Sequence, residues 1–175
     1  MMKKYVLSFL IFVIAYLIFA LLHEGCHAIL SSIFNEYSSF RILPFGFQVT
    51  FKTLVEDRAG IKWAVISGVP NILTLFTGYI LFHIRKNFLC FRNEIRYLFI
   101  YVVILFMIGD PFNLSIGPFI WGGDLYGITT GLSINQYILQ SIFLIILLIN
   151  RELIAQKLLP EFSIETKHIL LRKWL

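Results

Sequence analysis

The chain has 175 residues, a length that usually forms one domain. Hydrophobic residues make up 58% of it and charged residues only 14%, against roughly a quarter charged in a typical soluble protein, so an ordinary soluble domain is excluded. The formal net charge is +5, but no basic face with interleaved aromatic residues appears, which excludes a nucleic-acid-binding protein. We therefore expect a multi-pass integral protein of the lipid bilayer, with the cell membrane as its location.

The first segment is an uncharged apolar stretch from Tyr5 to Leu22, and helical propensity continues to about Phe34. Some thirty helical residues would be roughly 45 Å long, more than the ~30 Å hydrocarbon core requires. This segment is too long for a signal peptide and has no small-residue cleavage site, so we expect it to be kept in the mature protein. The first span is predicted at about 5–34.

A β-hairpin is predicted next, at about 38–54. Apolar residues alternate with polar ones on both sides of Leu43-Pro44-Phe45-Gly46, which supplies a turn. Unpaired backbone edges cannot face lipid. The hairpin should therefore lie at the membrane interface or pack against the helices.

Three further spans are predicted at about 63–84, 95–109 and 132–150. Pro111 is expected to stop or bend the third of them. The Gly- and Pro-rich stretch 110–127 should be irregular and partly sunk in the membrane, and a basic tail, 151–175, closes the chain. The predicted fold is thus an all-α membrane protein of about four transmembrane helices with one membrane-associated hairpin, forming a single domain over 1–175.

An even number of spans places both termini on one side of the membrane. The basic residues expected on that side are Lys3, Lys4, Arg85, Lys86, Arg92, Arg96, Arg151, Lys157, Lys167, Arg172 and Lys173. Those expected on the other side are Arg41, Lys52, Arg58 and Lys62. Because cationic residues near span ends are held on the cytoplasmic side, we predict cytoplasmic termini.

The first span carries a metalloprotease pattern, His23-Glu24-Gly25-Cys26-His27. Histidines at i and i+4 project from one face of a helix, as two ligands of a tetrahedral zinc require. Glu24 can then act as general base on a water whose pKa zinc lowers towards ~7. Ionisable residues within a spanning helix are costly unless they bind something, and this favours a zinc site over an accidental match. Cys26 points to another face, and it and Cys90 are expected to be free thiols.

A catalytic zinc takes three protein ligands and one open position. His83 and His168 lie at the wrong depth, and Glu36 cannot easily fold back from the end of the same helix. Asp110 and Asp124 remain, both at the depth of the motif. We favour Asp124 as the third ligand, with Asp110 as the alternative. The other aspartate would then be a cap or would support a ligand histidine.

Together these residues resemble the site-2 protease family of intramembrane zinc metalloproteases. The likeness spans about residues 15–130. After the His-Glu-x-x-His motif come a hairpin with Phe45-Gly46-Phe47 at its bend, Ser67-Gly68-Val69-Pro70-Asn71 in place of the family's second motif, and Phe112-Asn113-Leu114, Pro118 and Gly122-Gly123-Asp124 in place of its third.

The resemblance implies a zinc peptidase whose substrate is another membrane protein. It implies that Asn71 holds a substrate strand or donates to the developing oxyanion, although an interhelical hydrogen bond would equally explain this residue. It also implies that the hairpin edge pairs with an unwound substrate. The family's site lies nearer the cytoplasmic face, whereas the loop charges place this motif nearer the other face, and both orientations remain open.

The sequence therefore predicts a zinc-dependent endopeptidase that cuts in or near transmembrane segments, with His23, His27 and Asp124 as ligands and Glu24 as the base. One alternative is a zinc-binding membrane protein without proteolysis, such as a regulatory pseudoprotease. Another is a metal transporter, but this needs ionisable residues along a path through the membrane, and the cytoplasmic half of these spans has few.

Overall fold

The computed structural model describes residues 2–44, 46–120, 123–166, 168 and 170–174. In that part of the chain, four helices are long and apolar enough to cross a membrane, and the one sheet is a two-stranded hairpin after the first helix. The predicted fold class is confirmed. The elements in chain order are α1 (Met2–Ile33), β1 (Tyr37–Leu43), β2 (Gly46–Phe51), η1 (Val55–Asp57), α2 (Ile61–His83), η2 (Arg85–Phe88), α3 (Asn93–Ser115), η3 (Gly117–Phe119), α4 (Asp124–Leu132), α5 (Gln136–Leu153), η4 (Ile154–Leu158) and α6 (Leu159–Glu161).

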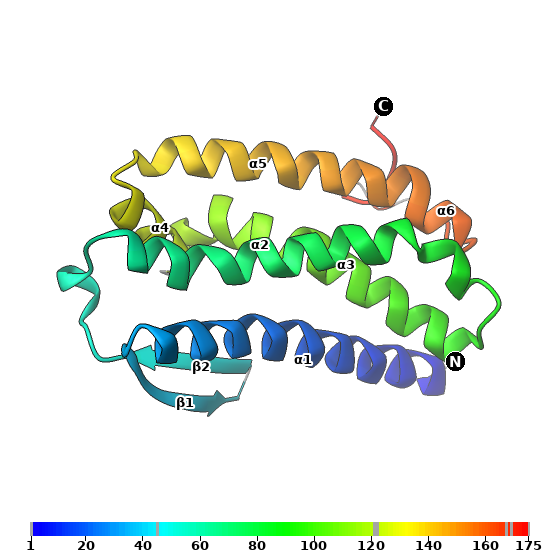
Figure 1. Ribbon diagram of the computed structural model, residues 1–175. Coiled ribbons are helices and arrows are strands. Elements are labelled where there is room, and N and C mark those ends of the chain that lie inside the picture. Colours follow the sequence, from blue (N-terminus) through cyan, green and yellow to red (C-terminus); the bar gives the residue numbers. More distant parts are fainter. Residues whose placement is uncertain (1, 45, 121–122, 167, 169, 175) are drawn as a thin grey trace.

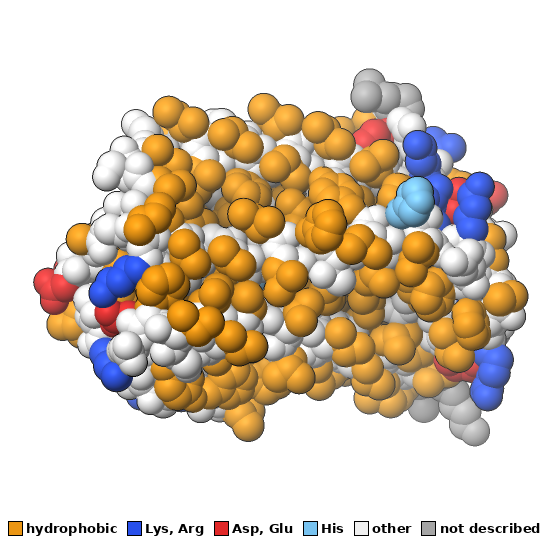
Figure 2. Space-filling view, in the orientation of Figure 1, with side chains coloured by type: hydrophobic (Ala, Val, Ile, Leu, Met, Phe, Trp, Pro, Cys, Tyr) orange, Lys and Arg blue, Asp and Glu red, His pale blue; other side chains and the backbone are white. Residues whose placement is uncertain are grey.

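The long helices α1, α2, α3 and α5 run lengthwise through one bundle, with α3 in contact with the other three. Both termini lie at one end of the bundle, and the hairpin and α4 lie at the other (Figure 1). Apolar side chains cover the middle of the visible face, while charged side chains gather at the two ends (Figure 2). This distribution suits a bilayer, whose hydrocarbon layer disfavours charged groups.

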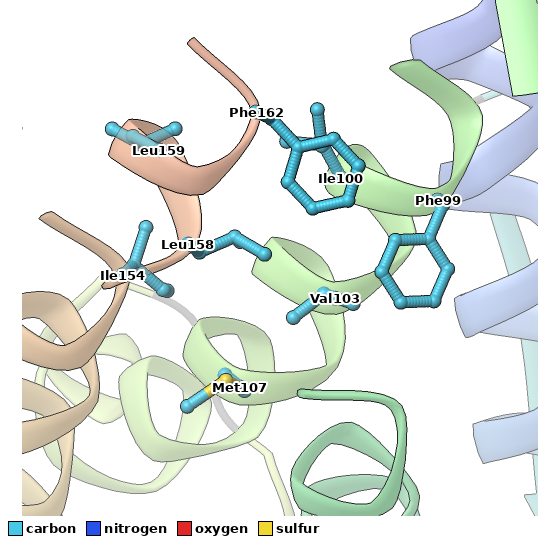
Figure 3. Close-up of a cluster of buried hydrophobic side chains, with 8 residues drawn as sticks. All are labelled: Phe99, Ile100, Val103, Met107, Ile154, Leu158, Leu159 and Phe162. Carbon is cyan, nitrogen blue, oxygen red and sulfur yellow. The ribbon is translucent and has the colours of Figure 1, made fainter. Parts of the chain in front are cut away.

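At the end with the termini, α3 packs against the C-terminal part of the chain through a buried apolar cluster (Figure 3). Its members are Phe99, Ile100, Val103, Met107, Ile154, Leu158, Leu159 and Phe162. The last four come from η4, α6 and the residue after α6, so this cluster fixes the end of the chain against the central helix. The helix that begins with α5 thus continues through a π turn to Glu161. The predicted fourth span ended too early, at about 150.

The third span also ends later than predicted. α3 continues through Pro111 to Ser115, whereas the sequence favoured an end near Gly109. A proline inside a helix leaves the carbonyl four residues earlier without its helical donor. That carbonyl belongs to Met107, and it accepts a hydrogen bond of 2.7 Å from the Asn150 amide on α5. The interhelical bond compensates for the missing one and lets α3 continue.

The hairpin prediction is confirmed, with its turn between Leu43 and Gly46 as expected. Gly46 and Phe47 belong to β2 and not to the bend that the resemblance implied; Phe45 lies outside the described residues. β2 packs against α1, and Val49 on it is buried. The hairpin therefore rests on the helices and does not extend freely into lipid, as its backbone polarity demands.

Glu36 joins three elements at the base of the hairpin. Its carboxylate accepts hydrogen bonds from the Lys62 ammonium at 2.6 Å and the Thr53 hydroxyl at 2.7 Å, and its backbone carbonyl accepts from the Lys52 amide at 2.8 Å. These contacts connect the end of α1 to the end of β2 and to the start of α2. The hairpin is thereby held in register beside α1.

Replacing Asn150 with Leu should destabilise the bundle, because the buried Met107 carbonyl then loses its donor. We expect the free energy of unfolding, measured in detergent micelles, to fall by about 1–3 kcal/mol. The matched control is Tyr79→Phe, which removes only the hydroxyl that donates to Asn150 at 2.7 Å. That change should cost less, about 0.6 kcal/mol. A smaller loss for Asn150→Leu than for Tyr79→Phe would contradict this account of Pro111.

Stability should depend on pH through Glu36. Its hydrogen bond to Lys62 lowers the pKa of Glu36 below the ordinary value of 4.5. The stabilisation is therefore complete above about pH 4.5 and disappears as the pH falls through the lowered pKa. The gap in thermal midpoint between wild type and Glu36→Gln should be largest at neutral pH and should close in acid. The same change at exposed Glu56 should produce no such gap.

Candidate metal centre

The two motif histidines lie on consecutive turns of α1, and both are buried. Their Nε2 atoms are 3.1 Å apart. Aromatic rings border them, with Phe19 beside His23 and Phe51 of β2 beside His27. The helix periodicity that the sequence predicted thus brings both imidazoles to one point in an apolar environment.

Asp124, the first residue of α4, meets both imidazoles. Its Oδ2 lies 3.2 Å from His23 Nε2, and its Oδ1 lies 3.3 Å from His27 Nε2. Ligand atoms around a tetrahedral zinc with bonds of about 2.0–2.1 Å are separated by about 3.3 Å. The separations of the two nitrogens and the carboxylate therefore fit a zinc ion, as does the chemistry of the donors.

Asp110 occupies a different position, on the far edge of the His23 ring. Its Oδ1 lies 3.0 Å from His23 Nδ1, and its Oδ2 accepts a hydrogen bond from the Thr74 hydroxyl of α2. A carboxylate on Nδ1 favours the tautomer that carries its proton there and leaves the Nε2 lone pair for a metal. Of the two aspartates left open by the sequence, Asp124 is thus the one that faces both Nε2 atoms.

Asn71 contacts Asp124. Its amide nitrogen donates to Asp124 Oδ2 at 2.9 Å and to the Ser67 carbonyl at 2.7 Å, so both of its N–H donors are used. Asn113 on α3 adds a longer contact to the same oxygen, at 3.4 Å. In this arrangement Asn71 orients Asp124, and donation to a substrate or oxyanion would require one of its two bonds to break.

Glu24 stands beside the imidazoles. Its side chain lies in a group with His23 and His27 whose ligand atoms are within 4.8 Å of one another. Its Oε2 accepts a hydrogen bond of 2.9 Å from the Val49 amide of β2. The hairpin therefore helps to fix the position of the Glu24 carboxylate, which α1 carries. Asp124 approaches the two nitrogens more closely than Glu24 does.

Two cavities border the site. The first, of about 650 Å³, lies between the motif, β2, the loop before α2 and the start of α4, and Glu24, His27 and Asp124 line it. The second, of about 390 Å³, lies between α1 and α3, and His23, Glu24 and Asp110 line it. Glu24 borders both, so molecules in either cavity could reach its carboxylate.

The sequence did not predict α4, because the stretch 110–127 was expected to be irregular. Small residues bring α4 onto α2. A side chain at Gly127 would collide with Ser67, and one at Gly131 would collide with the backbone of Ala64. Gly127 and Gly131 are four residues apart, the spacing that lets helices approach closely in membranes. This spacing is the sequence signal from which α4 could have been predicted. Gly122, part of the Gly122-Gly123-Asp124 segment, lies outside the described residues.

Thr74 was not predicted from the sequence as a residue of the site. It lies one turn after Asn71 on the same face of α2, so one helix supplies a polar partner to each aspartate. Among the residues excluded as ligands, Glu36 pairs with Lys62. Cys26 and Cys90 are free thiols, as expected.

No protein-family model, curated protein or solved structure matches this chain. The resemblance to site-2 proteases thus rests on the motifs, and the function has to be inferred from the site.

The close approach of α4 to α2 can be tested by the same substitution at two helical glycines. Gly131→Ala should lower the free energy of unfolding by about 1–3 kcal/mol, since the added methyl meets the Ala64 backbone. Gly25→Ala meets open space, and should leave stability unchanged or raise it by about 0.5–1 kcal/mol through helix propensity. Unfolding in detergent micelles measures both. Equal effects would show that the contact between α2 and α4 is not close.

Proposed function

We propose that this protein is a zinc-dependent intramembrane endopeptidase, which hydrolyses peptide bonds in or near the transmembrane segments of other membrane proteins. The observation that carries the proposal is the meeting of His23 Nε2, His27 Nε2 and Asp124 at 3.1–3.3 Å, with Glu24 beside them. A carboxylate next to a three-ligand zinc position is the arrangement that metallopeptidases use for general-base catalysis.

His23, His27 and Asp124 would hold the zinc. When bound, the metal would supply a Lewis acid that polarises the peptide carbonyl and acidifies a water molecule. Asp110 keeps the proton of His23 on Nδ1, and Asn71 keeps the Asp124 carboxylate directed at the imidazoles. These supporting contacts come from α2 and α3, and Asp124 itself comes from α4. The site therefore depends on three helices in addition to α1.

Glu24 would take a proton from the attacking water and return it to the leaving amine. The Val49 amide, 2.9 Å from Glu24 Oε2, holds the base in position. The edge of β2 that carries this amide also lines the larger cavity. An unwound substrate segment that pairs with this edge would bring its peptide bonds to Glu24.

Metal transport has less support. A transport path needs ionisable groups spread through the depth of the membrane. Among the described residues, the buried ionisable side chains within the spans are His23, His27 and Asp110 around one site, together with Arg151 near the end of α5. This distribution fits a single reaction centre better than a path.

For orientation, we infer that the end with both termini faces the cytoplasm. Arg85 and Lys86 of η2 lie there, with Arg85 hydrogen-bonded to Glu161 of α6, and so does Arg96, whose guanidinium lies over the Phe162 ring. The motif would then lie nearer the opposite face, because His27 is within two turns of the end of α1.

The zinc site and the chemistry can be tested separately. Purified Glu24→Gln should retain about one equivalent of zinc and lose cleavage by roughly 10²–10⁴-fold, since the base but no ligand is removed. Asp124→Ala should lose the metal, whereas Asp110→Ala should keep the site with zinc affinity reduced about 10–100-fold. Metal analysis and cleavage of a reporter transmembrane segment in micelles provide the readouts.

Zinc bound by wild type with no cleavage of any reporter would favour the regulatory, non-proteolytic alternative. Full activity in Glu24→Gln would refute the mechanism. If Asp110→Ala empties the site while Asp124→Ala does not, the ligand set is wrong.

A further inference from the structure

Arg58 brings a positive charge into the larger cavity beside the metal position. It follows η1, in the loop that leads to α2, and it lines the same 650 Å³ space as Glu24, His27 and Asp124. Arg58 is only half-buried, so its guanidinium lies where a molecule in that cavity can meet it.

Two aromatic rings hold the guanidinium in place. Its central carbon lies 4.5 Å from the centre of the Trp63 ring and 4.9 Å from that of Phe51. Trp63, at the start of α2, is fully buried, and Phe51 ends β2 while its ring contacts that of His27. Arginine stacked in this way keeps the edge of its planar fork free for hydrogen bonds.

The charge of Arg58 has no ion-pair partner among the described residues. Asp124, Glu36 and Glu56 act on this charge only through space, and Glu36 is already paired with Lys62 at 2.6 Å. The Nε atom of Arg58 is buried and has no hydrogen-bond partner in the described part of the chain. Burial lowers the pKa of Arg58, yet a guanidinium remains charged at physiological pH. An oriented cation without a partner is the arrangement expected of a binding group.

We propose that Arg58 is a specificity residue that binds a carboxylate of the peptide in the larger cavity, so that the enzyme prefers segments with an acidic group close to the cleaved bond. This rests on the proposed function, because it takes the occupant of the cavity to be a peptide. A planar fork matches a carboxylate through two parallel hydrogen bonds. The carboxylate can belong to an Asp or Glu side chain or to a free C-terminus.

Peptide hydroxamates test this without any cleavage, because the hydroxamate binds zinc and the peptide extends into the cavity. One series carries Asp, Asn or Leu at successive positions on the N-terminal side of the hydroxamate, and a second carries them on the C-terminal side. The second series is made with free and amidated C-termini, which separates a side-chain carboxylate from a terminal one. Affinities are measured by calorimetry on the zinc-loaded full chain in detergent micelles.

At one position, wild type should bind the acidic hydroxamate about tenfold to hundredfold more tightly than its neutral isostere. In Arg58→Gln this ratio should fall to about one, and in Arg58→Lys it should be intermediate, because an ammonium keeps the charge without the fork. The ratio is taken within one sample, so partial unfolding of a variant does not change it. Lys52→Gln is the matched control, since Lys52 is exposed and lies outside the cavity lining, and it should keep the wild-type ratio.

Equal binding of acidic and neutral hydroxamates to wild type, or an unchanged ratio in Arg58→Gln, would overturn the role of Arg58 while leaving the zinc site intact. If dihexanoyl phosphatidylglycerol, but not phosphatidylcholine, displaces the acidic hydroxamate, Arg58 serves a lipid headgroup and the proposal is wrong. If no hydroxamate binds to a chain that holds zinc, both the proposed function and the role of Arg58 fail.

Discussion

Ionisable side chains inside a lipid-spanning bundle must find partners, and this requirement determines how the helices meet. His23, His27 and Asp110 are buried within spans, where an unpartnered polar or charged group costs several kcal/mol. Their partners come from other helices. Asp110 contacts His23 and Thr74, and Asp124 contacts both imidazoles and Asn71. The polar residues of α2, α3 and α4 therefore converge on one short stretch of α1, and the apolar surface of the bundle closes around them.

The sequence predicted the elements whose signals are local. Four apolar stretches and one alternating segment gave the spans and the hairpin, since hydropathy and periodicity are read over neighbouring residues. The misplaced boundaries have non-local causes. Pro111 stays within α3 because Asn150, far along the chain, satisfies the carbonyl it exposes. α4 forms because Gly127 and Gly131 fit against α2, and glycine content alone had indicated an irregular segment.

The candidate site was predictable to a similar extent. The spacing of His23 and His27 predicted that both imidazoles project from one face of the same helix. Depth in the membrane then reduced the candidates for a third ligand to Asp110 and Asp124. What separates those two is which edge of the His23 imidazole each meets, a property of how α3 and α4 pack. The anchoring of Glu24 by the Val49 amide and the stacking of Arg58 between Phe51 and Trp63 likewise arise from tertiary contacts of the hairpin, for which the sequence offers no spacing rule.

Among the described contacts of the imidazoles, none comes from α5, yet Asn150 on α5 stabilises the turn of α3 that precedes Asp110. Tyr79 of α2 donates to the same Asn150, so α2, α3 and α5 are joined at this point. A designer who transplanted α1 and the hairpin into another helical membrane protein would carry over the motif but not the placement of Asp110 on His23. The smallest transferable unit of this site is the four long helices together with α4 and the hairpin, since α4 carries Asp124, β2 holds Glu24 and Asn150 on α5 supports the turn before Asp110.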